Sequence, residues 1–534
     1  MIRINQIKLP LEAGDAELRA AAAKILRCPA RKILTLEVAR RAVDSRKKND
    51  VYFVYNVNVT VDGDEDSLIA KAKDGKAEKY TPFRYDLPEN KRTSSLRPVV
   101  VGFGPAGLFA AQTLAKAGLR PIVLERGDCV EERTKKVRTF WETKELDENS
   151  NVQFGEGGAG TFSDGKLTTG IKDTLCRQIF LEFVRHGAPQ EILYSATPHI
   201  GTDKLGGVVK SMREEIISLG GEVNFRCRLT GLIVANGFIH GIVYENAEGK
   251  TLELETDTVI LAIGHSARDT VEMLYESGVK MIQKPFSVGT RIEHPRELID
   301  RSQYGEFAGH PKLGAANYKL SCHPQGGRGA YTFCMCPGGT VVAASSEKGR
   351  MVVNGMSEYA RDGENSNSAI LVGIEPQDFG SEHPLAGMHL QREIEIAAFE
   401  AAGSDYRAPA QLVGDFLNNV PSEKLGSVRP SCPTGVTPGD IRTVLPQKVT
   451  DTIADALVKM DKQLKGFALP DAVLTAPESR SSSPVRITRD EYFQCNIGGI
   501  FPCGEGAGYA GGIVSAGVDG IRCAHAVLAD ENNF

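Results

Sequence analysis

Alternating hydrophobic and polar positions predict strands near both ends of the first 86 residues. The stretches IRINQIKLPL and DVYFVYNVNVTV alternate and are rich in β-branched or aromatic side chains. Between them, DAELRAAAAKILR and TLEVARRAVDSRKK carry apolar residues at helical spacing, which predicts two helices. We therefore expect a small N-terminal α/β domain over residues 1–95, whose end overlaps a polar linker, LPENKRTSSLRP, at 87–98.

The next stretch, VVVGFGPAGLFAAQTLAKAGLRPIVLERG at 99–127, predicts a strand, a glycine turn, a helix and a second strand. Gly102 permits the tight turn, Gly104 lets the backbone approach a pyrophosphate, and Gly107 lets the helix pack closely on the strand. The helix N-terminus supplies free N–H groups and a partial positive charge. Glu125 lies 23 residues after Gly102, where an acid can accept hydrogen bonds from a ribose diol. This unit predicts a dinucleotide site, to which we also assign Pro105, Ala106 and Arg126.

A second element near the C-terminus bears on which dinucleotide is bound. In NIGGIFPCGEGAGYAGGIVSAGVDGIRCAHAVL, at 496–528, we expect a strand that ends at Glu505, a glycine turn, and a helix from about Ile513. It resembles the second FAD motif of glutathione-reductase-like flavoproteins, with Glu505 in place of the usual aspartate. By that resemblance Glu505 would bond the ribityl chain, and the helix N-terminus would lie under the flavin N1 and C2 carbonyl, where it stabilises negative charge.

Two further stretches complete the predicted cofactor site. TDTVILAIGHSARDT, at 256–270, resembles the Ala-Thr-Gly motif of these flavoproteins, with Ile263 at the threonine position. Three motifs in this order favour FAD over NAD. The glycine-rich NVQFGEGGAGTFSDGKLTTG, at 151–170, matches a loop that lines the pyrophosphate and flavin edge in related proteins, although a flexible surface loop is the alternative. The remaining cofactor residues that we predict are Gly157, Gly158, Gly160, Thr161, Gly165, Gly264, His265, Ser482, Gly504, Gly511 and Gly512.

Six stretches together resemble the uncharacterised FAD-dependent dehydrogenases of bacteria: RRAVDSRKKNDVYFVY, QFGEGGAGTFSDGKL, GRGAYTFCMCPGGTVVAASSEKG, VVNGMSEYARDGENSNSAILV, ESRSSSPVRITRD and PCGEGAGYAGGIVSAGVDGI. The resemblance spans most of the chain. It implies an α/β flavoprotein with a small N-terminal domain and a Rossmann-like FAD domain of glutathione-reductase type, split between 96–285 and 486–534. The inserted α+β substrate domain would occupy 286–485. The resemblance implies no particular substrate.

The inserted domain carries the candidate catalytic residues. KPFSVGTRIEHP predicts its first strand, and GRGAYTFCMCPGGTVVAAS, at 327–345, predicts two strands around a turn at Gly338–Gly339. The segment YTFCMCP resembles, distantly, a strand that lines the substrate cavity over the flavin in geranylgeranyl-reductase-like flavoproteins. Cys334 and Cys336 would point to one face of that strand, as redox or nucleophilic thiols or as small core residues. With Tyr331, they are our catalytic candidates.

Weaker candidates lie on either side of this segment. Arg291, His294 and Arg328 could bind an anionic substrate, and Arg480 with Ser481–Ser483 could bind flavin or pyrophosphate oxygens. The histidines lack metal-ligand spacing, so no metal is expected. Because there is no second G-x-G-x-x-G, we expect NAD(P)H, if it is used, to bind transiently in the substrate cleft, or another donor to reduce the flavin.

Composition narrows the function classes. The formal net charge of −5 over 534 residues argues against a surface devoted to nucleic acid, although residues 31–48 hold seven basic and two acidic residues. An FAD-dependent oxidoreductase acting on a small or medium organic substrate is therefore preferred. An RNA-linked flavoprotein and a non-enzymatic FAD-binding regulator are the alternatives. Eleven cysteines without a C-x-x-C, no signal-peptide-like start and no membrane-length apolar run favour the cytoplasm.

Overall fold

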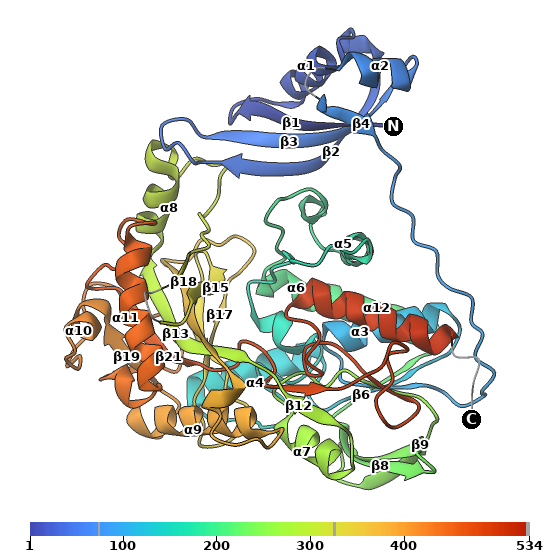
Figure 1. Ribbon diagram of the computed structural model, residues 1–534, viewed down its shortest axis with the longest axis vertical. Helices are drawn as coiled ribbons and strands as arrows, with labels where there is room; N and C mark the ends of the chain where they lie inside the picture. Colours follow the sequence, from blue (N-terminus) through green and yellow to red (C-terminus); the bar gives the residue numbers. More distant parts are fainter. Residues whose placement is uncertain (73–74, 324–326, 530–534) are drawn as a thin grey trace.

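The N-terminal part folds as a four-stranded antiparallel sheet with two helices on one face (Figure 1). The computed structural model describes residues 1–72, 75–323 and 327–529. The elements are β1 (Ile2–Pro10), α1 (Asp15–Leu26), β2 (Ile33–Asp44), β3 (Tyr52–Val61), α2 (Glu65–Lys71) and β4 (Ala77–Lys79). Their sheet order, β2-β3-β1-β4, is that of the ferredoxin-like βαββαβ fold.

The helix predicted over TLEVARRAVDSRKK is wrong, because its first ten residues belong to β2. This strand pairs with β3 from Ile33 to Asp44, and Leu36 and Val38 pack against the core under the helices. A bulge between Val38 and Arg40 interrupts the two-residue period and so blurred the strand pattern in the sequence. The strands predicted at β1 and β3 and the helix predicted at α1 are confirmed.

The edge strand β2 also docks on the rest of the chain. The N–H of Arg41 donates to the carbonyl of Tyr194 at 2.7 Å, and the N–H of Ala196 donates to the carbonyl of Arg41 at 2.9 Å. The ammonium of Lys48 donates to the carbonyl of Gln303 at 2.6 Å. Part of the basic segment therefore holds the N-terminal sheet in place. From Tyr80 to Pro98 the chain has no helix or strand and runs down the outside of the molecule (Figure 1).

The second body is built on a parallel five-stranded sheet in the order β23-β11-β5-β6-β7. Its strands are β5 (Val99–Val101), β6 (Ile122–Glu125), β7 (Glu222–Phe225), β11 (Val259–Leu261) and β23 (Ile500–Pro502). Helices α3 (Pro105–Lys116), α5 (Leu175–Arg185), α6 (Thr202–Ser218) and α12 (Ile513–Ala529) share a core on one face. The antiparallel β8 (Arg228–Ala235), β9 (Phe238–Glu245) and β10 (Thr251–Glu255), with α7 (Arg268–Glu276), cover the other face. Helix α4 (Val130–Thr143) packs against α6. The strand–turn–helix units predicted at both glycine turns are confirmed.

The third body holds a seven-stranded mixed sheet in the order β14-β15-β18-β13-β21-β19-β20. These strands are β13 (Phe286–Pro295), β14 (Ser321–Cys322), β15 (Ala330–Cys336), β18 (Asn365–Ile374), β19 (Ala408–Leu412), β20 (Val436–Pro438) and β21 (Val473–Glu478). Helices α8 (Arg296–Tyr304), α9 (Ala386–Ala401), α10 (Val413–Leu417) and α11 (Gln447–Asp461) accompany it. Two short pairs complete the fold, β12 (Met281–Gln283) with β22 (Val485–Ile487), and β16 (Thr340–Ala343) with β17 (Val353–Met356). The two strands predicted around Gly338–Gly339 exist, but they belong to different sheets.

A buried ionic cluster joins the second and third bodies. The carboxylate of Glu395, on α9, accepts hydrogen bonds from Arg268 at the start of α7 and from Arg480 after β21, at 2.7–2.8 Å. All three side chains are almost fully buried. Although burial raises it, the two guanidinium groups hold the pKa of Glu395 well below its usual range. This carboxylate bonds two buried guanidinium groups at once, and Glu347 pairs with Arg268 as a second acid.

Replacing Glu395 should therefore lower the free energy of unfolding by more than the loss of one surface charge does. Glu395→Ala removes the one carboxylate that bonds both guanidinium groups and leaves Arg268 with Glu347 and Arg480 with two serine hydroxyls, so we expect the free energy of unfolding to fall by about 3–5 kcal/mol. Glu393→Ala, on the exposed face of the same helix, is the matched control and should change it by less than about 0.5 kcal/mol. Denaturant unfolding of both variants measures this, and equal losses would contradict the role given to Glu395.

Candidate active site

A single cavity of about 750 Å³ lies where the carboxyl ends of β5, β6, β11 and β23 meet, and it reaches across to β15 of the third body. Ligand sites in open parallel sheets commonly lie at this edge. Its volume is in the range of sites that enclose a small organic molecule or much of a cofactor. The lining comes from residues 101–106 and 124–126, from parts of the segments 153–170, 262–270 and 503–516, and, from the third body, from segments around 317–319, 332–335, 352–354 and 478–481.

The first glycine turn is packed too closely for side chains at two of its three glycines. Gly102 has a φ of +96°, and a Cβ there would overlap the carbonyl oxygen of Ala262 in the segment after β11. A Cβ on Gly107 would overlap the carbonyl oxygen of Gly102, and Gly107 lies outside the cavity lining. A Cβ on Gly104 would have no atom nearer than the Cα of Gly158, at 3.6 Å, so a larger side chain would extend into the cavity. Pro105 and Ala106 line the cavity at the start of α3.

Glu125 connects the glycine turn, the chain after β6 and the glycine-rich loop at the floor of the cavity. Its carboxylate accepts the N–H groups of Phe103 at 2.8 Å, Gly127 at 2.8 Å and Gly155 at 2.9 Å. A carboxylate offers about four acceptor positions, so one remains for a group in the cavity. The ribose contact of Glu125 stays a prediction. Arg126 also lines the cavity, where it stacks over the ring of Phe154 and pairs with Asp269.

The glycine-rich loop is an ordered wall of the cavity, so the alternative of a surface loop is wrong. The fully buried guanidinium of Arg133 donates to the carbonyls of Asn151, Val152, Gly155 and Glu156 at 2.7–3.3 Å. Gly158 and Gly160 line the cavity. Gly157, Thr161 and Gly165, which we also predicted as cofactor residues, lie outside its lining and shape the loop: the hydroxyl of Thr161, for example, bonds the carbonyl of Glu156.

The second and third predicted motifs meet opposite this loop. The Glu505 carboxylate lies 3.5 Å from Nδ1 of His265, and both side chains line the cavity. The Nε2 atom of His265 is buried and has no hydrogen-bond partner among the described residues. Gly264 and Gly511 line the cavity, and a Cβ on either would meet nothing within 4 Å.

Gly512 and Ile513 follow in the same wall, so the first N–H groups of α12, which have no partner within the helix, face the cavity. These features fit FAD. The unpartnered nitrogen of His265, two glycines with free space beside them and the N-terminus of α12 all lie at the same cavity. Gly504 contributes no cavity surface, because its N–H donates to Asp519 at 2.7 Å behind the turn.

Ser482, which we predicted as a cofactor residue, lies outside the cavity lining, whereas its neighbour Ser481 lies in it. The Ser481 hydroxyl donates to the carbonyl of Ser287 at 2.6 Å, which fixes the segment after β21. Arg480 lines the cavity too, but its N–H groups are taken up by Glu395, Ser266 and Ser346. This arginine is a structural residue.

Among the catalytic candidates, only Cys334 reaches the cavity. A bulge between Phe333 and Cys336 breaks the alternation of β15, and Cys334 has a φ of +42°, an uncommon left-handed conformation. Cys334 lines the cavity, whereas Cys336 is fully buried behind it. Tyr331 lies outside the lining and donates its hydroxyl hydrogen to Ser287 at 2.8 Å.

The surroundings of Cys334 favour its thiolate. The neighbouring Cys336 thiol, opposed by burial and aided by the charges of Arg291 and Lys166, lowers the pKa of Cys334 below its ordinary value. Conversely, the pKa of Cys336 is raised, first by its interaction with Cys334 and then by burial. Arg291 also donates to the carbonyl of Cys334 at 2.9 Å, which holds the strained residue in place.

The anion-binding role suggested for Arg291, His294 and Arg328 is wrong. Arg291 is fully buried and pairs with Glu478 at 2.7 Å. His294 is fully buried against the carbonyl of Phe467, and burial lowers its pKa to about 4, so it is neutral. Arg328 pairs with Asp378 outside the cavity.

The sequence reasoning missed two lysines that line the cavity from opposite bodies, Lys166 and Lys319. Among the described residues neither has a carboxylate partner, whereas Arg126, Arg228, Arg361 and Arg480 in the same lining are all paired. Lys166 follows Asp164, which pairs with Arg361, in the FSDGK segment directly after the glycine run, and that position was the available signal. Two ammonium groups without a carboxylate partner among the described residues therefore line the cavity, and the charge of Lys166 acts on Cys334.

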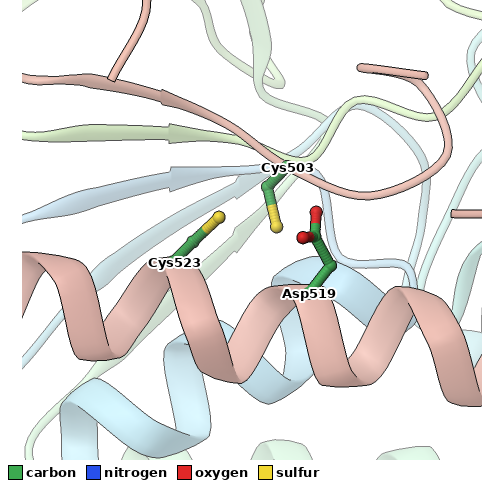
Figure 2. A group of neighbouring side chains, drawn as sticks. All are labelled: Cys503, Asp519 and Cys523. Carbon is green, nitrogen blue, oxygen red and sulfur yellow. The ribbon is translucent and has the colours of Figure 1, made fainter. Parts of the chain in front are cut away.

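Among the described residues, two clusters that contain acids resemble metal ligand sets. In both clusters an arginine side chain already pairs with the acids. In the first, Cys503, Cys523 and Asp519 converge between β23 and α12 (Figure 2). The guanidinium of Arg489 donates to both oxygens of Asp519, at 2.7 and 3.0 Å. In the second, Arg185 pairs with both Glu182 and Glu215 beside His186. No helix in the described ranges is long and apolar enough to cross a membrane.

Comparisons with known proteins give the family of the chain. Residues 96–285 match a family model described as pyridine nucleotide-disulphide oxidoreductase, and residues 285–481 match one described as FAD-dependent protein, C-terminal domain-like. Residues 1–60 match a domain of unknown function, DUF8436. An uncharacterized protein of Clostridium beijerinckii is 47% identical over 531 residues, which cover 99% of this chain and 98% of the relative.

The chain belongs to this uncharacterised FAD-dependent oxidoreductase family. The resemblance noted in the sequence, the α/β fold class and FAD as the cofactor are thereby confirmed. Among solved structures, a geranylgeranyl bacteriochlorophyll reductase-like protein from Thermoplasma acidophilum is 13% identical with a TM-score of 0.35, over 81% of this chain and 77% of the other. E. coli quinol fumarate reductase is 13% identical with a TM-score of 0.34, over 82% and 71%. Likenesses at this level do not bear on the function of the family.

The space beside Gly104 gives a direct test of the FAD site. Gly104→Val should abolish FAD binding, because its methyl groups would occupy the place of the pyrophosphate, while the Cβ itself fits without a clash. The ratio of flavin to protein absorbance after purification measures this. Gly207→Ala, on α6 with nothing within 4 Å of its Cβ, is the control and should keep its flavin. A Gly104→Val protein with full flavin content would refute this assignment.

The lowered pKa of Cys334 predicts an unusual pH profile for its alkylation. The thiolate is the form that reacts with iodoacetamide, so the alkylation rate at Cys334 should already level off below pH 8. The alkylation rate of an ordinary thiol, with a pKa of about 8.5, still rises above pH 8. Mass spectrometry of the labelled peptides gives the rate at each cysteine. In Cys336→Ala the midpoint should move upward, because alanine has no donor in place of the thiol. A wild-type midpoint at or above that of a free thiol contradicts this prediction.

Proposed function

We propose that the chain is an oxidoreductase that transfers a hydride or electrons between FAD and an organic substrate bound beside β15. The observation that carries this proposal is the shared cavity. It joins the three FAD motifs to Cys334 and Lys319, which come from outside those motifs. A protein that only stored FAD would have no need of a reactive thiol and unpaired lysines in the same space.

The residues around the cavity support such a transfer in distinct ways. FAD, when bound, supplies the hydride or electron chemistry. The N-terminus of α12 offers positive partial charge where negative charge develops, and Phe333 and Met335 cover part of the cavity from β15. Lys166 and Lys319 supply unpaired ammonium groups that suit an anionic group on the substrate or on a nicotinamide nucleotide. Eleven free thiols fit a reducing compartment, so we also propose that the chain works in the cytoplasm.

Reduction by pyridine nucleotides tests this proposal. We expect NADPH or NADH to bleach the flavin absorbance band of the purified protein within seconds under anaerobic conditions. Lys166→Ala should raise the nucleotide concentration needed for half-reduction roughly tenfold, because a hydrogen bond to a charged group contributes about 1.5–3 kcal/mol. Lys172→Ala, an exposed lysine outside the cavity lining, is the matched control and should behave as the wild type.

Two results would change the proposal. If neither nucleotide bleaches the flavin while dithionite does, pyridine nucleotides are not the donors, and the substrate or a protein partner must reduce the flavin. If no organic donor or acceptor alters the flavin at a useful rate, the non-enzymatic regulator is the better description.

A further inference from the structure

The bulge in β15 brings Cys334 and Cys336 together at the edge of the cavity. Two residues apart along a regular strand, Cα atoms lie about 6.6 Å apart, close to the upper limit of about 6.8 Å for a disulfide. The left-handed turn at Cys334 makes the chain more compact than an extended strand. The Cys336 thiol reaches back to residue 334 and donates to its carbonyl oxygen at 3.3 Å.

The two cysteines are also unequal in the way that a redox pair requires. Cys334 faces the cavity, where a reaction partner can reach it, and Cys336 is fully buried behind it. The Arg291 guanidinium lies 3.9 Å from the Cys336 sulfur, and its ion pair with Glu478 keeps it there. A cation at this place stabilises an attacking or leaving thiolate.

We propose that Cys334 and Cys336 form a dithiol/disulfide couple that exchanges two electrons with the FAD in this cavity. The proposal rests on the proposed function, because it requires FAD to bind beside β15. In the oxidative direction, a bond forms between the Cys334 thiolate sulfur and the Cys336 sulfur, and the S–H bond of Cys336 breaks. FAD takes up that proton and both electrons, so charge and atoms balance without another reactant. In the reverse direction, reduced FAD opens the disulfide.

The other cysteine pair at the cavity is arranged differently. Cys503 lines the cavity after β23, and its sulfur faces Cys523 on α12 (Figure 2). The carboxylate of Asp519 lies beside Cys503 (Figure 2) and disfavours a thiolate there. The pKa of Cys503 is raised by its interaction with the Cys523 thiol, by burial and by the charge of Asp519. Both cysteines are fully buried. This pair therefore serves as the internal control.

Counting electrons decides between the two pairs. After mild oxidation and removal of the oxidant, the wild-type holoprotein is titrated anaerobically with dithionite while flavin absorbance is followed. FAD accepts two electrons and a disulfide accepts two more, so we expect about four electron equivalents per FAD. Cys336→Ser should need about two, and Cys523→Ser should still need about four. A wild-type requirement of two, or a loss in Cys523→Ser but not in Cys336→Ser, would overturn the assignment to Cys334 and Cys336.

A second measurement separates failure of this inference from failure of the proposed function. Deflavinated wild-type protein, to which one equivalent of FAD is added back without air, is digested after alkylation. The peptide that contains Cys334 and Cys336 should then be two hydrogen atoms lighter and unalkylated, and the Cys336→Ser peptide should be alkylated at Cys334. If FAD binds and pyridine nucleotides reduce it but this peptide stays fully alkylated, the couple is wrong and the proposed function stands. If FAD does not bind, the proposed function itself fails.

Discussion

Close backbone packing around the first glycine turn is the constraint on which the rest of the structure depends. The turn at Gly102 touches the chain after β11, and Gly107 of α3 touches the turn. On α12, a Cβ at Gly520 would overlap the carbonyl oxygen of Ala106. Segments more than 400 residues apart can meet around one space only because side chains are missing at these contacts. Any larger residue there would push α12, and with it Glu505, away from the turn.

The cavity lies at the carboxyl ends of the strands, and a few charged side chains hold the surrounding segments in place. Glu125 joins the glycine turn to the glycine-rich loop, and Arg133 fixes that loop from behind through four carbonyl groups. The buried Glu395 with its two arginines then sets the third body against the second. As a result β15 faces the FAD motifs, and Cys334 comes to lie in the cofactor cavity although it belongs to another sheet.

The parts of this arrangement that were predictable are those encoded by local spacing. The glycine turn, the helix from Ile513 and the strands before them follow short-range rules, and the structure has them where the sequence predicts them. The failures have long-range causes. Strand β2 was mistaken for a helix because its bulge hid the alternation, and pairing with β3 decided its conformation. Arg291 is a plausible anion-binding residue in the sequence alone, because its partner Glu478 lies 187 residues later in the chain. Lys166 and Lys319 line one cavity only because two bodies meet there.

The central claim is that the opening glycine turn holds the ADP half of FAD while α12 and β15 hold the flavin half. Equilibrium titration of the deflavinated protein with FAD and, separately, with FMN tests it most directly. FMN lacks the adenosine and one phosphate, and every 1.4 kcal/mol of lost contact is a tenfold loss of affinity. The account predicts that FAD binds at least about a hundredfold more tightly than FMN, since the helix N-terminus at Pro105 would otherwise lack its anion. Equal affinity for the two flavins would contradict it.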